Sequence, residues 1–111
     1  MAYDEDLAQR ILALLGSEGN ATEKKMFGGL AFLVGGNMAV AASGQGGLLV
    51  RVDPAESDRL VAETDARPME MRGREMAGWL RVASDDVQAV DALQTWVELG
   101  VAYARSLPAK R

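Results

Sequence analysis

The chain has 111 residues, of which 49% are hydrophobic and 25% are charged, and its formal net charge is −4. These values fit one globular domain, expected to span residues 1–111, and exclude a disordered chain. The sequence contains no cysteine and no histidine, which excludes disulfides, thiol chemistry, Cys- or His-based metal sites and Ser-His-Asp catalysis, and we expect neither a cofactor nor a metal ion.

The N-terminal segment Met1–Asp6 is acidic and has neither the basic region nor the apolar region of a signal peptide. The longest apolar run, Leu30–Val34, is far shorter than the roughly 20 residues of a membrane span. We therefore expect a cytoplasmic protein that does not bind membranes.

An amphipathic helix is predicted from about residue 4 to residue 16. Leu7, Ile11, Leu14 and Leu15 recur at the spacing of one helical face. Three acidic residues precede them, where the helix dipole favours negative charge.

Glycines separate three apolar runs between residues 24 and 52. The runs are Leu30–Val34, Met38–Ala42 and Leu48–Val52. Short runs divided by turn residues predict a meander of three antiparallel strands. Gly35-Gly36-Asn37 is expected to supply the positive φ angles that a tight turn requires.

A second helix is predicted to begin at Asp53 and to end near residue 63 or 64. Asp53 is a good N-cap, and Pro54 suits the first helical position. Glu56 stands where the carboxylate of a capping box reaches back to the cap.

A second strand pair is predicted at Pro68–Met71 and Gly78–Ala83, joined through Arg72-Gly73-Arg74. The last helix is expected to be capped by Ser84 and to run to about Ser106. The order is therefore α-β-β-β-α-β-β-α. We predict an α+β fold, a two-layer α/β sandwich in which a five-stranded antiparallel sheet carries helices on one face and leaves the other to water or a partner.

An ordered set of short motifs resembles the N-terminal domain of the TfoX/Sxy family. The motifs are Lys25–Phe32, Asn37–Val40, Leu49–Val52, Arg67–Met69, Gly73-Arg74, Met76, Gly78-Trp79, Trp96-Val97 and Ala102–Pro108. No single motif is distinctive, but the set runs over about residues 5–108. The chain resembles that domain standing alone, without the family's C-terminal domain.

The resemblance implies a fold similar to that of secretion chaperones. It also implies a regulator, because the family's named members control competence genes together with a cyclic-AMP receptor protein. Those members carry a second, helical domain, so the resemblance implies a regulatory module rather than the whole competence role. It carries over no catalytic residue.

Two glycine-rich segments are interpreted as turns or close contacts. Gly44-Gln45-Gly46-Gly47 lacks the ending of a phosphate-binding loop and joins two strands, which indicates a hairpin. Met26, Phe27, Gly28 and Gly29 form a candidate signature loop, whose glycines allow a close backbone approach. We expect this approach to be to the first helix, with a ligand as the alternative.

Methionines gather in two parts of the predicted sheet. Met69, Met71 and Met76 surround the second hairpin, whereas Met26 and Met38 lie in the first sheet segment. We expect them to fill the core, and an adaptable binding surface is the alternative.

Trp79 and Arg81 alternate with Leu80 and Val82, so the two pairs point to opposite faces of the sheet. If the aliphatic pair faces the helices, the tryptophan lies on the open face, where Trp beside Arg is typical of protein interfaces. The alternative is that Trp79 packs against a neighbouring strand or the N-terminal segment. The remaining candidate interface residues are Arg51, Arg72 and Arg74.

Charge is segregated along the chain. Residues 1–23, 53–65 and 85–98 each carry a net charge of −4, and the rest carries +8. Acidic helices and more basic strands would give two faces that attract each other in a homodimer or hold an anionic partner, with simple solvation as the alternative. Direct nucleic-acid binding is disfavoured, because the pI is about 4.8.

These observations predict a non-enzymatic protein-interaction or regulatory module, a homodimer that binds a protein partner through the open sheet face or an edge strand. The alternative is a small-ligand or anion-binding domain with weak enzymatic activity. It would use Arg51, Arg72, Arg74 and Arg81 around a pocket near Gly28-Gly29. A direct DNA-binding transcription regulator is the third interpretation.

Overall fold

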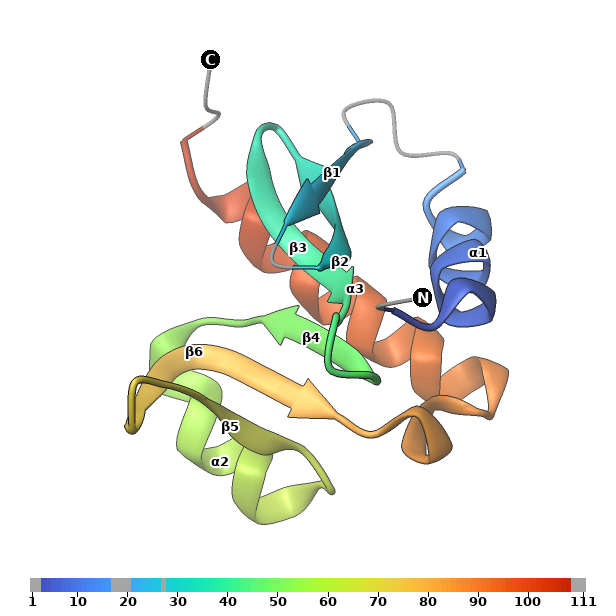
Figure 1. The fold of residues 1–111 in the computed structure, drawn as a ribbon. Coiled ribbons are helices and arrows are strands. Elements are labelled where there is room, and N and C mark those ends of the chain that lie inside the picture. The colour runs from blue at the N-terminus through green and yellow to red at the C-terminus, as the bar shows by residue number, and fades with distance from the viewer. Residues whose placement is uncertain (1–2, 17–20, 27, 109–111) are drawn as a thin grey trace.

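The computed structural model describes residues 3–16, 21–26 and 28–108. Its helices and strands are α1 (Glu5–Leu14), β1 (Ala21–Met26), β2 (Gly29–Val34), β3 (Asn37–Ala42), β4 (Leu48–Arg51), α2 (Ser57–Glu63), β5 (Arg67–Met71), β6 (Arg74–Val82) and α3 (Val90–Ser106). Short 3-10 turns at Pro54–Glu56 and Ser84–Val87 precede α2 and α3. The strands form one antiparallel sheet in the order β1-β2-β3-β4-β6-β5 (Figure 1).

The described sheet has six strands, so the prediction of five was wrong. The additional strand is β1, at the edge of the sheet. Its four central residues are exposed, and its sequence has no apolar alternation from which a strand would be predicted. Backbone pairing with β2, from Ala21 opposite Val34 to Met26 opposite Gly29, holds it in place. Exposed charged side chains are typical of an edge strand.

The five predicted strands are present, although β6 begins four residues before the predicted Gly78. Gly35 and Gly36 form the β2–β3 turn with φ angles of 60° and 82°. Asn37 does not belong to that turn. It begins β3, is buried, and its side-chain Nδ2 donates a hydrogen bond to the Pro108 carbonyl at 3.0 Å.

The helix starts follow the predictions in part. Asp4 caps α1 by accepting a hydrogen bond from the Leu7 backbone N–H at 3.1 Å. Asp53 caps the 3-10 turn before α2 rather than α2 itself. The predicted capping box is absent, because the Glu56 carboxylate pairs with Arg59. That hydrogen bond, with the negative charge of Glu56, raises the pKa of Arg59.

The prediction that Ser84 caps the last helix was wrong. Residues 84–87 form a 3-10 turn without a side-chain cap, and α3 begins only after this turn. The Ser84 hydroxyl donates to Asp4 Oδ2 at 3.4 Å, and Arg10 Nη2 donates to the Val87 carbonyl at 2.9 Å. The segment is therefore fastened to α1, which delays the start of α3.

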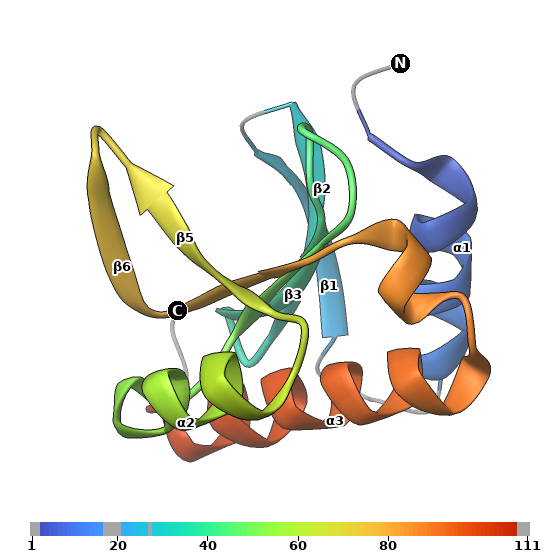
Figure 2. The ribbon, with the colours of Figure 1, turned by 90° about the horizontal axis from the view of Figure 1, so that it is seen from below.

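α2 and α3 lie along one side of the sheet, and α1 packs against α3 and β3 (Figure 2). Residues from all three helices and from the central strands share one buried cluster. None of the described helices is long and apolar enough to cross a membrane.

α3 approaches the sheet closely at Gly100. A Cβ atom added there would lie 2.4 Å from the Ala39 carbonyl oxygen and 2.9 Å from Val40 Cγ1. Both neighbours belong to β3, and the carbonyl is backbone that cannot rotate away. Hydrogen in place of a side chain thus allows α3 to lie directly on β3.

We predict that Gly100→Ala destabilises the fold by about 1–3 kcal/mol, the usual cost of overpacking. The sign of this change in the free energy of unfolding is informative, because alanine in an unobstructed helical position is more stable than glycine by roughly 0.5–1 kcal/mol. Urea unfolding measures the difference. Ala102→Gly, at an exposed position of the same helix, is the control and should lose only that propensity. Increased stability of Gly100→Ala would contradict the close approach.

Candidate functional site

The sheet face opposite α2 and α3, here called the open face, carries the predicted Trp79 and Arg81. Both side chains are half-buried, whereas Leu80 between them is 0% exposed and belongs to the core. Arg51 lies opposite Trp79, and Leu49 lies opposite Arg81, on the neighbouring strand β4. Residues opposite each other in a sheet share a face, so all four belong to the open face.

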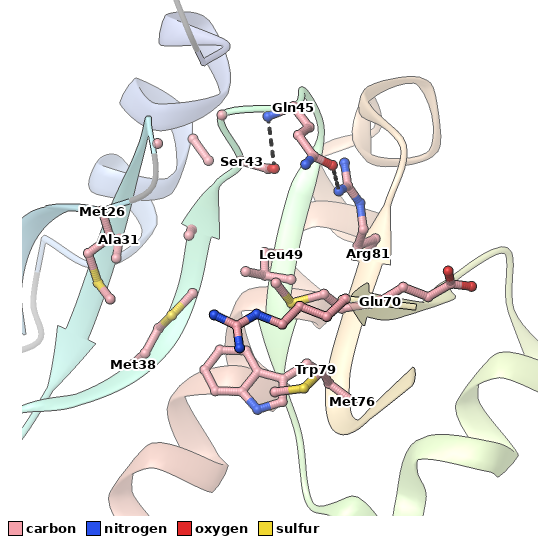
Figure 3. A pocket seen from close by; sticks show the side chains of 16 residues that line it. Met26, Ala31, Met38, Ser43, Gln45, Leu49, Glu70, Met76, Trp79 and Arg81 are labelled. Carbon is pink, nitrogen blue, oxygen red and sulfur yellow. Dashed lines mark hydrogen bonds between the residues drawn. The ribbon is translucent and has the colours of Figure 1, made fainter. Parts of the chain in front are cut away.

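A groove of about 470 Å³ runs over the open face. Its large apolar side chains are Met26, Met38, Leu49, Met69, Met76 and Trp79, and its polar ones include Gln45, Glu70, Arg72 and Arg81. Figure 3 shows the side chains from β1, β2 and β3 on one side, those from β6 on the other, and Leu49 of β4 between them.

One wall of the groove is the β5–β6 hairpin, which rises from the sheet where β6 bends (Figure 2). Pro68 of β5 pairs with Leu80, but the next residue, Met69, pairs with Met76. Residues 77–79 of β6 therefore have no partner of their own in β5. An excess of residues on one strand bends that strand and increases its twist.

Gly78 lies at the centre of this bend, with a φ of 84° that favours glycine. Its N–H donates to the buried hydroxyl Oγ of Ser57 in α2 at 2.7 Å, and its carbonyl accepts from the Val52 N–H at 2.8 Å. A Cβ atom at Gly78 would lie 2.9 Å from the Val52 carbonyl oxygen. The bend is therefore held on both sides by backbone and by α2.

A second irregularity shapes the opposite side of the groove. Phe32 of β2 pairs with Val40 of β3, and Leu33 pairs with Met38, which leaves Ala39 as an additional residue. Because side chains alternate between faces, simple continuation from the core residue Val40 would direct Met38 toward the helices. The additional residue instead returns Met38 to the open face, where it lines the groove.

The expectation that the methionines fill the core was wrong for those whose side chains are described. Among the methionines whose side chains are described, none belongs to the buried core, and Met26, Met38, Met69 and Met76 all line the groove. The side chain of Met71 lies outside the described part. Methionine side chains are flexible and polarisable, which suits a surface that adapts to what it binds.

Trp79 lies on the open face and is also covered in part by the side chain of Arg51 from the neighbouring strand β4. The guanidinium carbon of Arg51 lies 5.1 Å from the centroid of the Trp79 ring and 5.6 Å from that of Tyr103 in α3. Stacking of this kind is a favourable cation–π contact. Arg51 therefore fixes the tryptophan but does not line the groove.

Two of the remaining candidate arginines line the groove and one does not. Arg72 lies in the β5–β6 turn, with a φ of 56°, and Arg81 lies on β6, whereas Arg74 is outside the lining. The Arg81 guanidinium donates to Gln45 Oε1 and to the Gly46 carbonyl, so it fastens the β3–β4 loop to β6 (Figure 3). That loop joins two strands, as predicted.

The candidate signature loop contributes to the groove through Met26 and Gly29. Phe27 lies outside the described residues. A Cβ atom at Gly29 would lie 2.4 Å from the Ala42 carbonyl oxygen and 2.9 Å from the Gly44 backbone nitrogen. At Gly29, therefore, the expected approach to the first helix was wrong, and the backbone approaches the end of β3 instead.

The side chains that line the groove suit it to binding rather than to acid–base chemistry. The titratable groups in its lining are one carboxylate, Glu70, and the two guanidinium groups of Arg72 and Arg81. Within the described residues, no cluster of three or more carboxylates could hold a metal ion. Large apolar side chains make up most of the remaining surface, so the arrangement favours a ligand with apolar groups.

We predict that Met38→Gln and Met76→Gln each cost less than about 1 kcal/mol of stability, because these side chains line a surface groove. Leu80→Ala, in the core, should cost about 2–5 kcal/mol by comparison. Thermal or urea unfolding of the three variants measures the differences. If either methionine variant lost as much stability as the leucine variant, that methionine would belong to the core and not to the groove.

Comparison with curated proteins gave no match for this chain. Comparison with protein families gave a match to the family described as TfoX N-terminal domain, over residues 13–104. The matched range includes every strand of the described sheet and most of α3, and hence the whole groove. All of the motifs that carry the resemblance lie within this range except the end of Ala102–Pro108, and the chain belongs to the TfoX N-terminal domain family.

Proposed function

We propose that this domain is a non-enzymatic regulatory module that binds a partner protein in the groove on its open face. The observation that carries the proposal is the groove itself, which presents a tryptophan, a leucine and four methionines on the face that the helices leave uncovered. Partly exposed apolar clusters with polar rims are typical of protein-interaction sites. Family membership supports a regulatory or competence-related domain.

The edges of the sheet are less suited to a partner than its face. Lys24 and Lys25 are exposed on the edge strand β1, and charged edge strands resist pairing with another strand. The other edge strand, β5, contains Pro68, which has no N–H to donate. We therefore assign the partner to the open face rather than to an edge.

A small anionic ligand is the second candidate function. The volume of about 470 Å³ lies within the range of small-molecule pockets, and Arg72 and Arg81 line it. However, Arg81 is already engaged by the β3–β4 loop. Direct DNA binding is supported less, because the chain is acidic overall.

The finer parts of the proposal are a two-layer arrangement similar to secretion chaperones and a homodimer. A homodimer was inferred from the attraction between acidic helices and a more basic sheet. Unlike faces of identical chains join head to tail, and such contacts close only in rings. A closed pair would therefore require a self-complementary contact in addition to this attraction.

Capture of a partner tests whether the groove is the binding site. From a lysate of the source organism, the wild-type protein should retain a partner that the double variant Trp79→Ala/Arg81→Ala loses. Val90→Ser is the matched control, since it removes an apolar side chain that is 66% exposed outside the groove. Circular dichroism should show that both variants are folded. A double variant that is folded and retains every captured protein would contradict the proposed site.

The mass of the intact protein tests the homodimer. Native mass spectrometry should show a species of twice 11.9 kDa, with no additional small-molecule mass. A strictly monomeric mass at high protein concentration would contradict the homodimer. A reproducible additional mass that disappears in the Trp79→Ala/Arg81→Ala variant would favour the small-ligand function instead.

A further inference from the structure

We infer that the groove receives an amphipathic α-helix of another protein, with an apolar stripe flanked by carboxylates. This inference rests on the proposed function and adds the chemistry of the partner to it. Three observations carry it: the strands beneath the groove are paired on both sides, cations surround the groove, and the apolar stripes of this chain's own helices are buried in the core.

The strands beneath the groove favour a helix over an extended segment. β2, β3, β4 and β6 each have a neighbour on both sides, so the backbone at the floor of the groove is already paired. An extended segment lying across them would find no backbone partners for its own N–H and C=O groups, which are costly to bury unpaired. A helix satisfies these groups internally and can bury one apolar stripe.

The cations around the groove favour a partner with carboxylates. Lys24 of β1 lies opposite Ala31, which lines the groove, so Lys24 flanks it on the open face. Arg67 lies directly opposite Arg81, and Arg72 lines the groove from the β5–β6 turn. Within the described part of the chain, none of these four forms an ion pair with a carboxylate.

This arrangement of charge is unfavourable in the free domain. Like charges directly opposite each other in a sheet repel, as Arg67 and Arg81 do. Two carboxylates also belong to the β5–β6 hairpin, Glu70 of the lining and Glu75 directly opposite it on β6, and the four cations outnumber them. Acidic residues on both flanks of an incoming helix would neutralise these cations from outside the apolar stripe.

A second copy of this chain does not supply such a helix. Its described helices are acidic, but their apolar stripes are already buried in the core, with Leu7, Ile11, Leu93 and Val97 at most 3% exposed. The large apolar side chains that remain exposed in the described residues are Leu12 and Val90, one each on α1 and α3. Two isolated residues do not make a stripe, so the occupant comes from a different protein.

The test uses three synthetic helical peptides of about 18 residues with the same leucine stripe at i, i+3, i+4 and i+7. One carries glutamate on both flanks of the stripe, one carries glutamine, and one carries lysine. Fluorescence anisotropy of labelled peptide measures binding to the intact protein. We expect the glutamate peptide to bind at least about tenfold more tightly than the lysine peptide, with an affinity that falls as salt is added.

Two neighbouring lysines provide matched variants. Lys24 lies on the open face, whereas Lys25 lies opposite Leu30, which packs against the core on the other face. Lys24→Glu should weaken binding of the glutamate peptide by about two- to fivefold, the range for one exposed ion pair. Lys25→Glu makes the same change of charge and should weaken it less. Arg72→Asp should act like Lys24→Glu, since aspartate tolerates a positive φ.

Several results would overturn the inference. Equal affinity for the glutamine or lysine peptide would show that carboxylates are not required. Undiminished binding after a proline is placed at the centre of the glutamate peptide would show that the peptide does not bind as a helix. Equal effects of Lys24→Glu and Lys25→Glu would move the binding away from the open face. If none of the peptides binds, the inference fails. The proposed function stands or falls separately, on whether a captured partner is lost by the Trp79→Ala/Arg81→Ala variant.

Discussion

The bend of β6 at Gly78 determines the shape of the open face. Three residues of β6 have no partners in β5, and Gly78 among them has a positive φ. Two hydrogen bonds of the Gly78 backbone, one of them to the Ser57 hydroxyl, hold this conformation. Together they direct the end of the β5–β6 hairpin away from the plane of the sheet. Without this bend, Met69, Met76 and Arg72 would extend the sheet instead of forming a wall. The groove is thus a consequence of backbone geometry, and its side chains occupy a shape that the backbone already provides.

The central strands carry apolar side chains on both faces, which one layer of helices cannot cover. In β3, Ala39 and Val40 belong to the core under α3, whereas Met38 and Ala41 line the groove. Strands that are apolar on both faces are typical of sheets that are covered on both sides. The helices cover one face of this sheet within the described part of the chain. The other retains an apolar floor, and covering that floor with a partner would be favourable by the same hydrophobic effect.

Much of the fold could be predicted from the sequence. Apolar runs bounded by glycines indicate β2, β3 and β4, and helical spacing indicates α1 and α3. β1 could not be recognised, because an edge strand held by backbone pairing needs no apolar alternation. The predicted start of α3 was also wrong, because the hydrogen bonds from Ser84 and Arg10 link segments that are far apart in the sequence.

The candidate site was predicted in part, and its central feature was not. Strict alternation was enough to assign Trp79 and Arg81 to the face opposite Leu80. The groove depends on two places where alternation fails, the additional residue at Ala39 and the bend at Gly78. Periodicity cannot anticipate them, so the methionines were assigned to the core. The available signal was the uninterrupted apolar character of Leu30–Val34 and Met38–Ala42, which indicates strands covered on both faces.

Charge is also distributed unevenly along the chain. The acidic excess lies in residues 1–23, 53–65 and 85–98, which include α1, α2 and the first half of α3, and the remainder of the chain carries the basic excess. Arg67 opposite Arg81 is unfavourable for folding, by up to about 1 kcal/mol for a pair of like charges. Gln45 and the Gly46 carbonyl accept hydrogen bonds from Arg81, but neither carries a charge. Repulsion among the cations therefore persists in the free domain, and an acidic occupant of the groove would relieve it while covering the apolar floor.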